Sequence, residues 1–124
     1  MEPKNKNILE TNEELWPPEL DALVASPKQH KLLFENERVR VLETHIAPGE
    51  TTPAHTHCWP SVYYILSWSD FLRRDGEGNL MVDSRENEKF RNPPPSMWSD
   101  ALPLHSLENV GDQPITLISF ELKD

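Results

Sequence analysis

Three histidines are the residues of this chain whose type and spacing best suit the binding of a metal ion. His55 and His57 stand two residues apart, and His105 lies far downstream. Successive side chains of a strand point to opposite faces, so His55 and His57 are expected on the same face of one strand. Neutral imidazoles bind divalent transition metals, and three of them leave coordination positions for water or substrate. The spacing therefore predicts a metal centre that is open to a small molecule.

Turn signals flank both histidine segments. Pro48-Gly49 precedes the first pair, and Val110-Gly111-Asp112 follows His105. Since the two segments are about 50 residues apart, they must meet across a sheet to share an ion.

The chain from residue 30 onward has the pattern of short strands separated by turns, with no long helical period. A bulge is expected between Val41 and Leu42, where the alternation shifts. Residues 75–79 predict a hairpin turn, 85–89 a charged connection, and 93–95 an extended lead into the loop that carries His105. This pattern predicts an antiparallel barrel or jelly roll. The expected strands are 31–34, 38–46, 55–57, 61–72, 80–82 and 115–122.

The N-terminal part differs from this strand-rich region. Residues 1–28 are expected to form an arm and residues 29–124 the barrel domain. Leu20, Leu23 and Val24 share a helical face, which predicts one or two short helical turns near 18–25. Trp16 and this apolar face need another surface to cover them.

Gly49, the His55-x-His57 pair and the distant His105-x-x-x-Asn109 resemble the paired motifs of the cupin superfamily, specifically its small single-domain members with a three-histidine metal site. The resemblance covers roughly residues 29–123. It implies an all-β double-stranded β-helix in which His55, His57 and His105 hold one divalent transition metal ion per chain. Iron is the ion that the resemblance favours, and nickel, zinc, manganese and copper stay open. Asn109 is expected in a turn or as a hydrogen-bonding support of the ligands.

Two departures from the cupin pattern affect the site. Cupins usually carry a glutamate four or five residues after the second histidine, where this chain has Ser61 and Val62. No acidic ligand is therefore predicted. The usual Pro-x-Gly before the later histidine is replaced by residues 100–104, so the loop that presents His105 is expected to differ in shape.

Residues near the motifs are candidates for the cavity wall. Ser61 shares the parity of His57, and Trp59, Tyr63 and Trp98 are expected to line the pocket, with simple core packing as the alternative. Cys58 is expected to point away from His57 as a half-buried thiol. His30 and His45 lie outside the motifs and are interpreted as surface histidines.

Composition restricts the partners and the location. A net charge of -9, from 12 basic and 21 acidic residues, argues against nucleic acid. No apolar run reaches the roughly 18 residues that span a membrane. One cysteine and a polar start predict a cytoplasmic protein.

The resulting hypothesis is a mononuclear metal enzyme, dioxygenase-like by resemblance, that acts on a small organic metabolite. Isomerase or lyase chemistry is its nearest variant. The alternative is a metal-dependent module that binds or senses a small molecule without turnover, and a third reading is a barrel kept for dimerisation alone. A homodimer is expected because small cupins commonly pair sheet to sheet.

Overall fold

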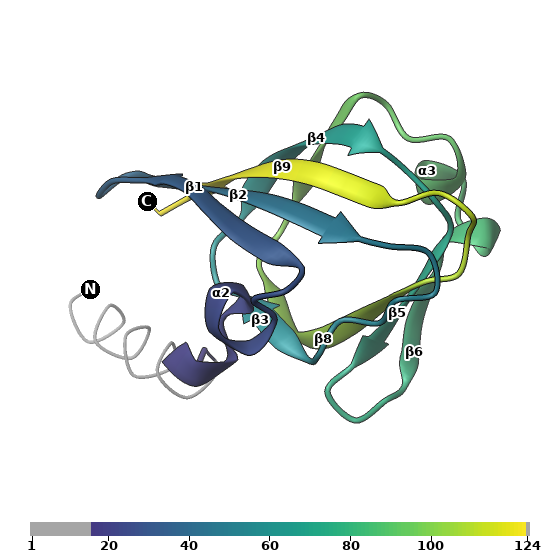
Figure 1. Cartoon of the computed structure of the whole chain (residues 1–124), viewed down its shortest axis with the longest axis horizontal. Helices are drawn as coiled ribbons and strands as arrows, with labels where there is room; N and C mark the ends of the chain where they lie inside the picture. The colour runs from purple at the N-terminus through teal and green to yellow at the C-terminus, as the bar shows by residue number, and fades with distance from the viewer. Residues whose placement is uncertain (1–15, 124) are drawn as a thin grey trace, which may run out of the picture.

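A computed structural model describes residues 16–123, whose strands form two antiparallel sheets. The strands are β1 (His30–Glu35), β2 (Val39–Ile46), β3 (His55–His57), β4 (Ser61–Ser67), β5 (Phe71–Asp75), β6 (Leu80–Asp83), β7 (Ser96–Ser99), β8 (Leu102–Asn109) and β9 (Ile115–Leu122). One sheet has the order β1-β2-β9-β4-β7 and the other β3-β8-β5-β6. Figure 1 shows them as two facing layers. The predicted all-β jelly roll is therefore confirmed.

Short helices lie at two places in the chain. They are η1 (Pro18–Leu20), α2 (Ala22–Ala25), η2 (Ser84–Glu86) and α3 (Glu88–Arg91). The predicted helical turns near 18–25 are confirmed, and the arm before residue 16 lies outside the described residues. Asp21 begins α2 by accepting a hydrogen bond from the Leu23 amide at 3.0 Å. The predicted charged connection at 85–89 is exposed, and it forms parts of η2 and α3, whose N-caps are Asp83 and Asn87.

The sequence prediction was wrong about three features of the strands. The expected strand 61–72 is divided, since β4 ends at Ser67 in the five-stranded sheet and β5 begins at Phe71 in the other. The bulge lies in β1 between Leu32 and Phe34, whereas β2 pairs with β9 without a break. His105 stands inside β8 rather than on a loop. The 75–79 turn joins β5 and β6 as predicted.

The interior has an apolar and a polar part. The core cluster consists of Ile46, Phe71, Phe90, Met97 and Ile115. Other interior positions hold buried polar side chains, including three histidines, an arrangement that costs free energy unless each polar atom is bonded. These buried polar side chains therefore mark a candidate functional site.

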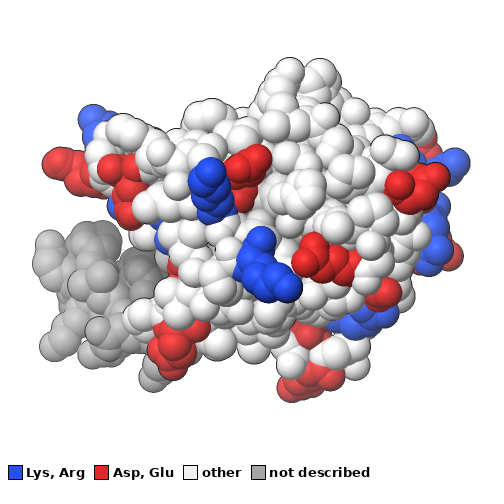
Figure 2. Space-filling view, in the orientation of Figure 1, with Lys and Arg blue, Asp and Glu red and all other residues white. Residues whose placement is uncertain are grey.

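The outer surface carries both signs of charge. Figure 2 shows acidic and basic side chains next to one another on one face of the molecule. Within residues 16–123, the helices are too short for one to cross a bilayer.

Candidate metal centre

A cavity of about 300 Å³ lies between the two sheets, at the lower end of the range for small-molecule sites. Four histidines line it, together with several aromatic side chains. Of the residues that the sequence placed in the cavity wall, Trp59, Ser61 and Tyr63 line it. Trp98, which is 51% exposed, also contributes to the lining from the edge strand β7, although its strand partner is the outward-facing Val62.

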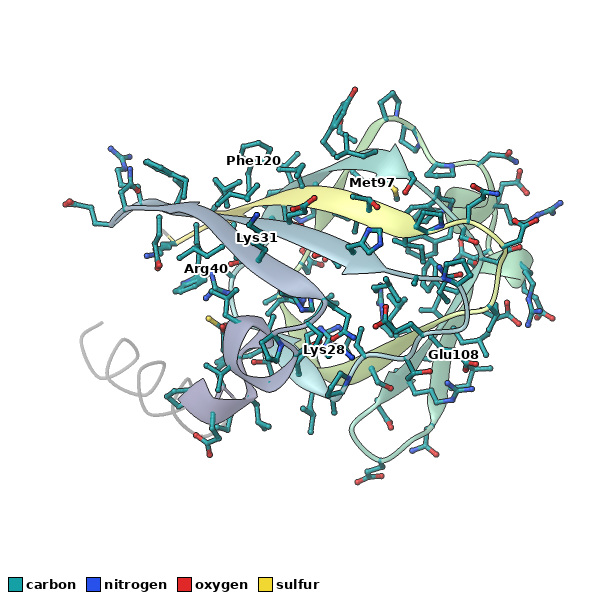
Figure 3. All side chains as sticks on the ribbon, in the orientation of Figure 1. Lys28, Lys31, Arg40, Met97, Glu108 and Phe120 are labelled. Atoms are coloured by element: carbon teal, nitrogen blue, oxygen red, sulfur yellow. The ribbon has the colours of Figure 1, made fainter. Side chains whose placement is uncertain are left out.

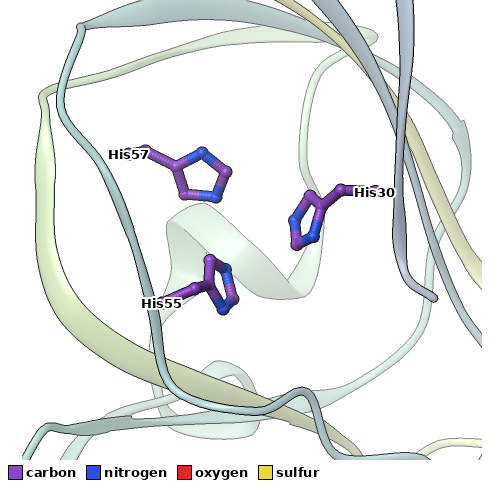
Figure 4. Close-up of side chains that lie close together, drawn as sticks. All are labelled: His30, His55 and His57. Carbon is purple, nitrogen blue, oxygen red and sulfur yellow. The ribbon is translucent and has the colours of Figure 1, made fainter. Parts of the chain in front are cut away.

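The histidines reach the cavity from both sheets. His55 and His57 project from β3, and His105 is the register partner of His55 on the neighbouring β8. His30 begins β1 in the opposite sheet. Figure 4 shows the rings of His30, His55 and His57 turned toward one shared space. Chain segments that are far apart in sequence therefore converge on one point.

The spacing between the rings suits a single ion. One nitrogen from each of His30, His55 and His57 lies within 4.8 Å of the others. The centroid of the His105 ring is 4.4 Å from that of His55 and 5.6 Å from that of His57. The described residues thus offer three closely grouped imidazoles and a fourth beside them.

His30 is not the surface histidine that the sequence predicted. His30 is only 5% exposed, and the centroid of its ring lies 4.7 Å from that of the His55 ring. The signal was present in the hairpin: β1 pairs His30 with Thr44, which has the same inward parity on β2 as the core residue Ile46. The prediction missed this because no motif includes His30.

Hydrogen bonds fix the tautomer of the rings. Nδ1 of His30 contacts the Ser26 carbonyl at 3.0 Å. Nδ1 of His55 and of His105 contact proline carbonyls two residues earlier, Pro53 and Pro103, each at 2.8 Å. A carbonyl only accepts, so each Nδ1 carries the proton and Nε2 keeps the lone pair that binds a metal.

His57 has a different partner with the same effect. Its Nδ1 lies 3.1 Å from Oε2 of Glu121 on β9. Burial raises the pKa of the Glu121 carboxyl, while the Arg40 guanidinium, 2.6 Å from Oε1, stabilises its ionised form. The carboxylate therefore accepts the Nδ1 proton and makes Nε2 of His57 a better donor to a cation.

Burial keeps all four imidazoles neutral. It lowers the pKa of His30 and His57 to about 3 and that of His105 to about 2, and it also lowers the pKa of His55. The neighbouring histidines lower three of these pKa values further, because they would be like charges when protonated. Metal binding requires the neutral ring, so the donor set fits a divalent transition ion at pH 7.

Acidification is expected to destabilise the metal-free protein. Below the ordinary histidine pKa of about 6.5 the unfolded chain binds more protons than the folded one, so stability falls as the pH decreases. Each ring that stays neutral in the fold contributes about 1.4 kcal/mol per pH unit to this loss. Urea denaturation at a series of pH values measures it. A midpoint that stays constant between about pH 7 and pH 4 would contradict the prediction.

The arrangement resembles solved structures, although no family model and no curated protein matches the sequence. A cupin domain from Bordetella pertussis Tohama I aligns with a TM-score of 0.57 and 21% identity, over 77% of this chain and 92% of that domain. An RmlC-like cupin with a double-stranded β-helix fold from Methanocaldococcus jannaschii aligns at 0.52 and 11%, over 75% and 77%. A double-stranded β-helix protein from Klebsiella pneumoniae aligns at 0.51 and 14%, over 76% and 70%. The chain has the cupin fold.

An acidic side chain reaches the histidines from another strand, β9. Ser61 stands at one of the two positions where the cupin pattern has a glutamate and this chain has none, and in the register of β4 and β9 it lies opposite Glu121. Sequence reasoning missed Glu121 because it lies 64 residues from His57. The pairing of β9 with both β2 and β4 was the signal that could have located it.

Glu121 belongs to a buried ionic network. Arg40 on β2 binds Glu121 through Nε and Asp21 through both terminal nitrogens at 3.0 Å. Figure 3 labels Arg40 on the side of the barrel next to α2. The side chains of Arg40 and Glu121 are 7% and 1% exposed. The network therefore connects the N-cap of α2 to the ring of His57.

Two further residues that the sequence singled out, Asn109 and Cys58, have other roles. Asn109 takes the turn role: its Nδ2 donates to the carbonyls of Ile46 and Gln113, and its Oδ1 accepts from the Gly111 amide. In the described part of the chain its side-chain hydrogen bonds go to backbone, not to the rings. Cys58 is partly exposed, and burial raises the pKa of its thiol, which makes it a weak nucleophile.

Proposed function

We propose that this cupin binds one divalent transition metal ion per chain and acts on a small organic molecule in the cavity beside it. The observation that supports this most strongly is the convergence of neutral, buried imidazoles with Nδ1 engaged. His55 and His57 would be ligands, with His30 and His105 supplying the remaining nitrogens. Iron is the ion that we favour, with nickel, zinc, manganese and copper as the alternatives to test.

The residues around the ligands have separate tasks. Glu121 orients His57 and raises its basicity, while the backbone carbonyls of Ser26, Pro53 and Pro103 orient the other rings. The aromatic walls exclude water and hold an apolar body. A redox-active ion held here would supply one-electron chemistry with oxygen, which makes a dioxygenase-like reaction our preferred class, with isomerase or lyase chemistry as the variant.

Oxygen uptake tests the catalytic part of this proposal. Protein loaded anaerobically with ferrous iron would be offered keto acids, diketones and thiols, and oxygen consumption recorded against metal-free protein. Uptake that needs both the iron and one compound supports the proposal. Stoichiometric iron and tight ligand binding without uptake would favour the alternative function.

That alternative is a binding or sensing module without turnover. One observation favours it: both carboxylates in the cavity lining are already engaged. Glu121 is bound to Arg40 and His57, and Asp100 accepts from the Trp98 indole at 2.8 Å. Among residues 16–123 the cavity wall therefore has no unpaired carboxylate to act as a general base.

We also propose a cytoplasmic location, because the single cysteine suits a reducing compartment.

We further propose a homodimer. Strand register places an apolar row across the outer face of the five-stranded sheet. Four of the five residues in this row are at least 40% exposed. An exposed apolar patch of this kind is typical of a protein–protein interface. The row consists of Phe34, Val41, Phe120, Val62 and Trp98.

A charge in the middle of this row is expected to give a monomer. Phe120→Glu places a carboxylate where a second copy would pack, and Figure 3 labels Phe120 on the outside of the barrel. Leu80→Glu is the control, because Leu80 is exposed on the other sheet. Light scattering at micromolar concentration measures the mass. A wild-type monomer, or an equal change in both variants, would contradict the dimer.

A further inference from the structure

Arg73 is a basic side chain of the cavity wall to which no carboxylate of residues 16–123 is bound. It shares the inward face of β5 with Phe71, and its register partner on β8 is Leu107, so all three line the cavity. Its neighbour Arg74 points the other way and forms an ordinary ion pair with Glu108 at 3.0 Å. Two adjacent arginines thus have opposite environments.

Within the part of the chain that the structure describes, no side chain pairs with the Arg73 guanidinium. Its Nε is buried and has no hydrogen bond, and within residues 16–123 Arg73 makes no ion pair. Burial lowers the pKa of Arg73, and Tyr63 is the one group that acts in the opposite direction. Since an arginine stays protonated in proteins, the fold holds a partly buried cation here.

The other charged groups of the cavity wall do not satisfy it. Glu121 is committed to Arg40 and His57, and Asp100 to Trp98. The other basic side chain of the wall, Lys89, lies over the Phe90 ring at 5.2 Å. In a protein of net charge -9, Arg73 is therefore a local positive site that faces the cavity.

Arg73 is also close enough to the histidines to share a ligand with them. Its register partner Leu107 stands two residues from His105 on the same face of β8, and its charge acts on His57 and His105. A molecule that binds Arg73 at one end would therefore have its other end near the rings. The cavity wall that Arg73 shares with Phe71 and Leu107 is apolar and suits the body of such a molecule.

We propose that Arg73 binds the carboxylate of the substrate, so that this cupin takes a small organic acid whose apolar body lies between Arg73 and the histidines. The planar guanidinium presents paired N–H donors that match the two oxygens of a carboxylate. The orientation toward the histidines depends on the metal function proposed above. The recognition of a carboxylate does not depend on it.

Acid and amide pairs test this inference. Pyruvate, benzoate and phenylacetate would be titrated by calorimetry against pyruvamide, benzamide and phenylacetamide, into metal-free and zinc-loaded protein. The metal-free arm is decisive, because zinc itself attracts carboxylates. The variants are Arg73→Met, Arg73→Lys and the matched control Arg74→Met on the outer face of the same strand.

At least one acid is expected to bind the metal-free wild type about tenfold or more tightly than its amide. Arg73→Met removes this preference, Arg73→Lys retains part of it, and Arg74→Met retains all of it. Without ligand, Arg73→Met is expected to have a Tm equal to or above that of the wild type, because an uncompensated cation has been removed.

Other outcomes overturn the inference. These are equal affinity for acid and amide, an acid preference that survives in Arg73→Met, no acid binding to either form at millimolar concentration, or a Tm of Arg73→Met below that of Arg74→Met. The failure of the metal proposal is distinguishable: zinc would not bind stoichiometrically, while the acid preference of the metal-free protein would remain.

Discussion

Replacing His57 with alanine is expected to lower the affinity for a divalent metal ion by about 100-fold or more. Even residues that only orient a metal ligand are worth about 10- to 100-fold in affinity, and His57 would itself be a ligand. The substitution also leaves the Glu121 carboxylate without the ring that it contacts at 3.1 Å. Competition with a chromophoric chelator, using zinc or cobalt, measures the change.

His45→Ala is the matched control for this experiment. His45 is an exposed histidine whose Nδ1 lies 3.0 Å from the Thr116 hydroxyl, outside the cavity. Its replacement is expected to leave the metal affinity unchanged. Equal affinity in wild type and His57→Ala, or an equal loss in both variants, would show that the metal binds elsewhere. The same assay on His30→Ala and His105→Ala separates a three-histidine from a four-histidine site.

Replacing Arg40 with methionine is expected to destabilise the protein by about 3–5 kcal/mol, the cost of removing one partner from a buried ion pair. The substitution leaves Glu121, 1% exposed, and Asp21 as adjacent carboxylates without a cation. It also removes the guanidinium that lies 5.0 Å from the centroid of the Trp59 ring. Urea denaturation at pH 7 measures the free energy of unfolding.

Arg74→Met provides the comparison for Arg40→Met. Both side chains of the pair formed by Arg74 and Glu108 are 32% exposed, and such surface pairs are worth about 0–1 kcal/mol. A loss in Arg40→Met no larger than the loss in Arg74→Met would mean that the buried network does not stabilise this fold.

The sequence predicted the strands because their alternation and turn residues are local signals. The 75–79 turn and the strand ending at Leu122 were found in this way. The division of 61–72 was missed, because Trp68, Ser69 and Asp70 leave one sheet for the other under tertiary contacts. One of these is the bond from the Trp68 indole to the Phe90 carbonyl at 2.9 Å.

The candidate site was predictable where a motif marks the histidines, His105 included, and hidden where no motif does. His55 and His57 follow from a two-residue spacing, whereas His30 and Glu121 reach the cavity only through the pairing of β1 with β2 and of β9 with β4. Arg73 could be found only from its unpaired Nε, which requires the packed interior. Burial and unpaired polar atoms are properties of the fold, so spacing alone does not give them.

His30 comes from the five-stranded sheet, and the other three histidines come from the four-stranded sheet. An ion bound by histidines of both sheets would cross-link the two layers. Metal binding and the stability of the barrel would then be linked, because an ion that binds only the folded chain raises its free energy of unfolding. The supply of metal in the cell would therefore affect the lifetime of each folded molecule as well as the fraction that carries an ion.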